Sequence, residues 1–173
     1  MKKSINPIKM HDGVPLRLVP HEPDNGYRFY VSDDGTVGLR IAPNGAEKIV
    51  NAAPTTCENS ANPTDAKRKQ RYLHFTHPWN TDEQILVSHA VYLAWVGPFD
   101  EPCIDHLNGI TTNNHWTNLD PVTYAENSRR AMYLRVLRDC GFDPRIFTAP
   151  QLREFFAQPF DEFKTAMYHH KDV

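Results

Sequence analysis

The chain has 173 residues, of which 40% are hydrophobic and 11% are aromatic. This length and composition suit one globular, soluble domain, or one domain with a small appendage, and they exclude wholesale disorder. The 19 lysines and arginines nearly balance the 21 aspartates and glutamates, so the formal charge is -2. Taken alone, this balance disfavours a nucleic-acid partner, because phosphate binding usually accompanies a basic excess.

The sequence has no feature that indicates a membrane or a disulfide framework. No run approaches the roughly 18 apolar residues that span a bilayer, and Met1 to Pro7 lacks the apolar segment of a signal peptide. We therefore expect a cytoplasmic protein with no membrane partner. Cys57, Cys103 and Cys140 are odd in number and widely spaced. His74, His77 and His115 could be combined with Cys103 as a zinc site, but no pair among these four has the close spacing that structural zinc favours. No structural zinc is expected.

The first half of the chain has the pattern of antiparallel strands. Residues 27–31 and 36–41 are rich in strand-forming side chains, and the Asp34-Gly35 pair between them is a strong hairpin signal. Residues 72–76 and 84–87 predict a second strand pair. Residues 1–97 are therefore predicted to be a β-rich platform.

A short helix and a long loop complete this first part. Ser88 is a plausible N-cap for the helix, which Gly97 and Pro98 should end. Residues 51–65, rich in Asn, Pro, Thr and Ala, predict a long surface loop. A basic cluster follows the loop, and it is either a solvated loop tip or a phosphate contact; it consists of Lys67, Arg68, Lys69 and Arg71.

The next segment predicts a strand, a loop, a strand and a helix. Residues 103–106 form a short apolar stretch with a polar end, an Asn-rich loop follows at 108–117, and a second strand is expected at 118–122. Thr123 and Glu126 have the spacing of a helix capping box, and Gly141 stands where the helix should stop.

The tail from residue 141 to 173 predicts two short helices. Thr148 and Gln151 form a second capping box, and Pro159 interrupts the helical pattern. Aromatic residues recur along the tail at helical spacing, which indicates packing, so no chemistry is assigned to it.

Polar side chains concentrate where the two later strands meet their helix. They are Asp105, His106, Asn108, Asn113, Asn114, Asn118, Glu126 and Asn127. Carboxylate and amide oxygens such as those of Asp105 and Asn127 are hard ligands suited to Mg²⁺. His106 beside such an ion would be free to take a proton from water.

Five segments in this region resemble the HNH endonucleases of the phage and intron-homing type. The resemblance covers roughly residues 85 to 131 and consists of Val87-Ser88-His89-Ala90-Val91, Ile104-Asp105-His106-Leu107-Asn108-Gly109, Thr112-Asn113-Asn114, Thr117-Asn118-Leu119 and Val122-Thr123-Tyr124-Ala125-Glu126-Asn127. The segments occur in the family's order at plausible distances, and the residues before them resemble its DNA-binding β segments more loosely.

The resemblance implies a ββα-metal nuclease core at residues 98–140, within an α+β fold. Asp105 and Asn127 would be metal ligands, His106 the general base, and Asn118 the residue that orders the hairpin loop. Asn127 stands where the family name has histidine, which makes this an HNN variant. The implied cofactor is one divalent ion, Mg²⁺, for which Mn²⁺ should substitute.

The implied activity is hydrolysis of double-stranded DNA, with one motif nicking one strand. Arg129 and Arg130 either contact phosphates or form a solvated helix face, and His89 is either structural or a phosphate contact. The alternative function is a DNA-binding or regulatory module that keeps the scaffold without cutting. Whether the protein is a monomer or a dimer stays open.

Overall fold

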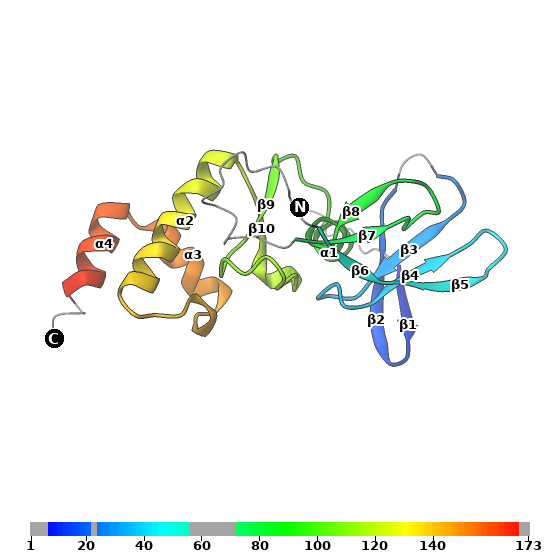
Figure 1. The fold of residues 1–173 in the computed structure, drawn as a ribbon, viewed down its shortest axis with the longest axis horizontal. Helices are drawn as coiled ribbons and strands as arrows, with labels where there is room; N and C mark the ends of the chain where they lie inside the picture. The colour runs from blue at the N-terminus through cyan, green and yellow to red at the C-terminus, as the bar shows by residue number, and fades with distance from the viewer. Residues whose placement is uncertain (1–6, 22–23, 56–71, 170–173) are drawn as a thin grey trace. The chain divides into compact units, whose positions relative to one another are not determined.

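The computed structural model describes residues 7–21, 24–55 and 72–169 (Figure 1). The chain divides into two compact units. The first extends to Phe99 and includes Thr111–Trp116; the second comprises Asp100–Ile110 and continues from Thr117. The described residues contain both antiparallel sheets and helices, which confirms the predicted α+β class.

The first unit contains a five-stranded antiparallel sheet whose strands pair in chain order. The predicted hairpin is confirmed as the third and fourth strands, and its turn contains Gly35 with φ +74°. A Cβ on Gly35 would lie 2.1 Å from Cγ1 of Val87, so the turn needs glycine for its conformation and for the close approach. The strands are β1 (Ile8–His11), β2 (Val14–Val19), β3 (Arg28–Val31), β4 (Gly38–Ile41) and β5 (Glu47–Val50).

A three-stranded sheet in the order β6-β7-β8 completes the β structure of this unit. Its strands are β6 (Ala52–Thr55), β7 (Tyr72–Thr76) and β8 (Gln84–Leu86). The predicted second strand pair is confirmed by β7 and β8. The surface-loop prediction for 51–65 is wrong at 52–55, because these residues pair with β7 through backbone hydrogen bonds.

Helix α1 (Val87–Trp95) follows β8 directly and contacts strands of both sheets. It ends before Gly97, as predicted, but Ser88 is not its N-cap. Leu86 occupies that position without a side-chain cap bond, while Ser88 lies buried inside the first turn. The close junction of β8 and α1 leaves no room for a separate capping residue.

The second unit is built on the predicted strand, loop, strand and helix, which are confirmed. Strand β9 (Cys103–His106) pairs antiparallel with β10 (Leu119–Val122), and helix α2 (Tyr124–Asp139) follows. The Thr123 hydroxyl caps α2 by accepting a hydrogen bond from the Glu126 amide at 3.1 Å. Gly141, with φ +85°, lies where α2 has ended.

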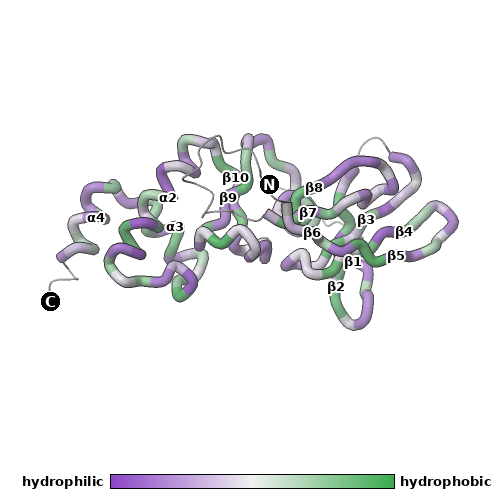
Figure 2. Tube along the Cα trace, viewed as in Figure 1, coloured by the Kyte–Doolittle hydropathy of each residue, from purple (hydrophilic) through white to green (hydrophobic). Residues whose placement is uncertain are grey.

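The tail forms α3 (Ala149–Ala157) and α4 (Phe160–His169), which confirms the two predicted helices. Both contact α2, and Figure 1 shows α3 beside it. Figure 2 shows hydrophobic and hydrophilic stretches alternating along these helices, as amphipathic packing requires. The apolar faces of α2, α3 and α4 meet in one core cluster, which consists of Leu107, Tyr133, Leu134, Val136, Leu137, Leu152, Phe156 and Phe163.

The helices of the described ranges are all too short or too polar to cross a lipid bilayer.

Candidate functional site

The end of β9 carries the two residues that the resemblance assigns to metal binding and to base catalysis. Asp105 and His106 are consecutive on the strand, so their side chains leave it on opposite faces. Asp105 lies opposite Asp120 of β10, and His106 lies opposite Leu119. Both predicted site residues are buried, with 9% of Asp105 and 3% of His106 exposed.

The loop between β9 and β10 is held by a pair of buried asparagines. The Asn118 side-chain oxygen accepts from the Asn108 amide at 3.2 Å, and its nitrogen donates to the Asn108 side-chain oxygen at 3.1 Å. The same Asn108 oxygen accepts from the Ile110 amide, and the Leu107 amide donates to the Asn118 carbonyl. Asn118 therefore has contacts suited to ordering the hairpin loop next to Asp105 and His106.

Asn127, the second predicted metal ligand, is the fourth residue of α2. Its backbone amide donates to the Thr123 carbonyl at 2.9 Å. Among the described residues, no hydrogen bond joins its half-buried side chain to another group. Asn127 precedes Arg130 by three residues, so the two lie on one helix face, and Arg130 contacts Asp105. The role of Asn127 as a metal ligand stays a prediction.

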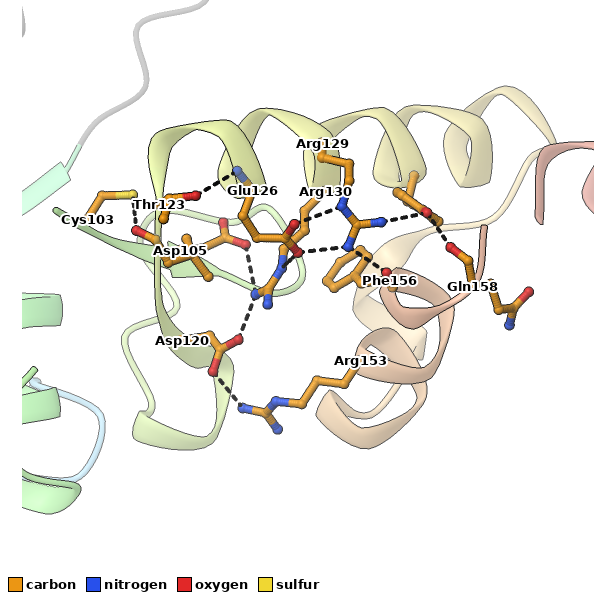
Figure 3. A network of polar contacts seen from close by, with 12 residues as sticks. Cys103, Asp105, Asp120, Thr123, Glu126, Arg129, Arg130, Arg153, Phe156 and Gln158 are labelled. Atoms are coloured by element: carbon orange, nitrogen blue, oxygen red, sulfur yellow. Dashed lines mark hydrogen bonds and ion pairs between the residues drawn. The ribbon is translucent and has the colours of Figure 1, made fainter. Parts of the chain in front are cut away.

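Arg130 is the centre of a carboxylate network (Figure 3). Its Nη1 lies 2.7 Å from Oδ2 of Asp120 and 3.5 Å from Oδ2 of Asp105, while its Nε donates to Oε1 of Glu126 at 2.8 Å. Only 12% of its side chain is exposed. The solvated-face alternative is therefore wrong for Arg130, because the guanidinium is buried among three carboxylates. A phosphate contact by Arg130 stays a prediction.

Arg129 joins α2 to the tail. It donates to both carboxylate oxygens of Glu126, to the Tyr133 hydroxyl at 2.7 Å and to the Phe156 carbonyl at 2.6 Å. The Tyr133 hydroxyl in turn donates to the Gln158 carbonyl. These bonds use four of the five N–H groups of the guanidinium, so a phosphate contact by Arg129, which also stays a prediction, would have to compete with them.

The two central carboxyl groups have opposite pKa shifts. Burial raises the pKa of Asp105, outweighing the opposing charge of Arg130. Hydrogen bonding from Arg129, then from Arg130, lowers the pKa of Glu126 to about 2. Glu126 is thus well compensated by its two arginines, whereas the buried Asp105 carboxylate is only partly compensated.

The donor chemistry at Asp105 and Asn127 fits a hard divalent cation. A partly compensated buried carboxylate favours a nearby positive charge, and an amide oxygen is a second hard donor. Two such ligands leave the remaining positions of Mg²⁺ to water and phosphate oxygens. Among the described residues, the candidate site included, no three His, Cys, Asp or Glu side chains gather as a metal-binding group.

The predicted DNA-contact set has two further parts, the basic cluster and His89. The basic cluster Lys67, Arg68, Lys69 and Arg71 lies outside the described residues, so its role stays a prediction. His89 is on α1 of the first unit, where its ring meets Phe99 edge-on with centroids 5.5 Å apart. Burial lowers the pKa of His89, so the imidazole is neutral at pH 7 and offers a phosphate no charge.

The His89 shift predicts a pH effect on stability. Since the pKa of His89 is lower in the folded protein than its ordinary 6.5, the unfolded chain binds the proton more readily. The stability that neutral His89 contributes is complete above pH 6.5. It is lost as the pH falls towards the pKa of His89 in the folded protein. Replacing His89 with Gln should therefore reduce the stability lost between pH 7.5 and 5, measured by denaturant unfolding with tryptophan fluorescence. Equal losses in both proteins would contradict this effect.

Comparisons of the chain with protein-family models, curated proteins and solved structures find no match.

Proposed function

We propose that the chain is a metal-dependent HNH endonuclease that hydrolyses phosphodiester bonds of double-stranded DNA by nicking one strand. The observation that carries this proposal is the ββα arrangement of β9, β10 and α2. Asp105 and His106 end the first strand, Asn118 closes the loop, and Asn127 lies in the first turn of the helix. This arrangement supports the residue roles that the family resemblance implies.

Each side chain has a distinct task in this proposal. Asp105 and Asn127 would hold Mg²⁺, which, when bound, offsets the negative charge that develops on the phosphate and the leaving oxygen. His106 takes the proton from the attacking water. Because its ring is almost wholly buried, His106 must act on a water held at the site and not on bulk solvent.

Asn118 contributes to the proposed reaction by holding the loop after β9 in place. Its paired hydrogen bonds with Asn108 fix the loop that leaves β9 directly after His106. The buried amides satisfy each other, so the loop has few alternative conformations that retain these bonds. A loop held in this way would limit the positions open to His106, which a positioned base requires.

The alternative, a module that binds DNA without cutting it, draws on the ion pair between Arg130 and Asp105. A site that is permanently neutralised by an arginine would keep the nuclease scaffold but hold no metal. This alternative predicts salt-sensitive binding of duplex DNA with no cleavage under any divalent cation.

Incubation of supercoiled plasmid with the full chain and Mg²⁺ tests the proposal. We expect relaxed circles to accumulate before linear DNA, since one motif provides one metal site. Chelation by EDTA should stop the reaction, and Mn²⁺ should restore it. Simultaneous linearisation would contradict the nicking mode, while binding without cleavage in Mg²⁺, Mn²⁺ and other divalent ions would favour the alternative.

A further inference from the structure

We propose that Arg130 is the internal counter-cation of the candidate metal site, and that a divalent ion competes with it for Asp105. The inference rests on the proposed function, because it concerns the same Asp105 carboxylate. It assigns Arg130 a positioning role: the guanidinium joins the two strands of the hairpin through Asp105 and Asp120 and sets how tightly the ion binds.

The first reason is the pairing of like charges across the hairpin. Asp105 and Asp120 are directly opposite residues on β9 and β10. Two carboxylates in this register destabilise an antiparallel pair. Nη1 of Arg130 contacts both, at 3.5 Å and 2.7 Å, and so supplies the positive charge that the pair requires.

The second reason is the inequality of the Arg130 contacts. The ion pairs with Asp120 and Glu126 are short, at 2.7 Å and 2.8 Å, whereas the contact with Asp105 is at the outer limit for a hydrogen bond. Arg130 can therefore release Asp105 without losing its two strong partners. A cation at Asp105 would replace the weakest contact of the network.

The third reason is that the tail prevents the guanidinium from swinging away. The Phe156 ring of α3 lies under it, with the Arg130 guanidinium carbon 5.2 Å from the ring centroid. Arg129 also binds the Glu126 carboxylate that Arg130 binds. Nη2 of Arg153 in α3 lies 3.7 Å from Oδ1 of Asp120. Arg130 thus keeps its positive charge beside Asp105 even when an ion arrives, and the repulsion lowers the affinity for that ion.

Titration of the full chain with Mn²⁺, followed by electron paramagnetic resonance, tests the inference. Arg130→Gln should tighten the dissociation constant roughly tenfold, as expected for removing one charge several ångströms from a divalent ion. Arg130→Lys keeps the charge and should bind close to the wild-type value. Arg135→Gln is the matched control, because Arg135 lies on the same helix with 83% of its side chain exposed, and its Nε lies 3.9 Å from Oδ2 of Asp139.

Thermal unfolding gives a second readout. Without metal, Arg130→Gln should unfold at a lower temperature than wild type, because Asp105 and Asp120 then face each other uncompensated. Saturating Mn²⁺ should raise its unfolding temperature more than it raises that of wild type. If Arg130 had a purely structural role, Arg130→Gln would weaken Mn²⁺ binding, whereas the counter-cation role predicts tighter binding.

The outcomes separate this inference from the proposed function. If Asp105→Asn abolishes Mn²⁺ binding while Arg130→Gln binds no more tightly than wild type, the counter-cation role is refuted and the metal site stands. If Asp105→Asn leaves Mn²⁺ binding unchanged, the metal site itself is refuted, and the counter-cation role with it.

Discussion

Replacing His106 with glutamine is expected to slow plasmid nicking by roughly 10²- to 10⁴-fold, the contribution of a positioned general base. Glutamine retains a polar side chain of similar reach but cannot accept a proton at neutral pH. His106 follows Asp105 on β9 and leaves the strand on its other face, so its loss should spare the metal ligand. The rate of relaxed-circle formation in saturating Mg²⁺ measures the effect.

Two controls make the His106 result decisive. The variant must keep the wild-type circular dichroism spectrum and unfolding temperature, because the ring is buried. It must also bind Mn²⁺ with the wild-type dissociation constant, which separates loss of the base from loss of the metal. A folded, Mn²⁺-binding variant that nicks as fast as wild type would contradict the assignment of His106.

Replacing Phe156 with alanine should lower the free energy of unfolding of the second unit by about 3–5 kcal/mol, the usual cost of truncating a buried phenylalanine. Phe156 is buried in the cluster between α2 and α3, where its ring packs edge-on against Tyr133 with centroids 5.7 Å apart. Its ring also supports the Arg130 guanidinium. The loss therefore affects the core and the carboxylate network together.

Far-UV circular dichroism during urea unfolding measures this change, because most of the helical residues lie in the second unit. Helices α2, α3 and α4 belong to the second unit, whereas Trp79, Trp95 and Trp116 belong to the first. The dichroism transition should shift while the tryptophan fluorescence transition stays unchanged. Ile146→Ala is the control, since Ile146 is 67% exposed and should cost less than about 0.5 kcal/mol. Equal shifts for both variants would contradict a core role for Phe156.

Much of the fold follows from local signals in the sequence. Asp34-Gly35 predicts the β3–β4 hairpin correctly, and the same reasoning extends to two turns that we did not predict. Asp12 and Gly13 join β1 to β2 with φ values of 48° and 80°, and Asn44-Gly45 lies in the turn between β4 and β5. The turn residues therefore indicate strands β1, β2 and β5, although lysine and proline lower the strand propensity of these segments.

Other parts of the fold depend on tertiary contacts. Strand β6 follows β5 after one residue and consists of Ala52–Thr55, a sequence that contains proline and has no alternating pattern. It becomes a strand because β7 supplies its hydrogen-bond partners. Likewise, α1 begins directly after β8 because the helix packs against both sheets, and Ser88 has no capping function there.

The sequence predicts the order of the strands and the helix that carry the candidate site, but not most of the ion pairs around Asp105. The spacing of Asp105, His106, Asn118 and Asn127 predicts a strand, loop, strand and helix, and the structure has these elements. Of the contacts that Arg130 makes, the sequence indicates the ion pair with Glu126, because the two residues are four apart on the helix. Its contacts with Asp105 and Asp120 depend on how α2 packs against the hairpin, which no local pattern encodes.

A crystal structure of the full chain grown with Mn²⁺ would show directly whether Asp105 and Asn127 hold a metal ion. We expect an anomalous peak bonded to oxygen atoms of Asp105 and Asn127, with His106 within hydrogen-bond reach of a water or phosphate next to the ion. Arg130 should still pair with Asp120 and Glu126. An ion bound at other residues, or contacts from Asp105 to Arg130 that persist without any peak in saturating Mn²⁺, would contradict the metal-dependent nuclease site.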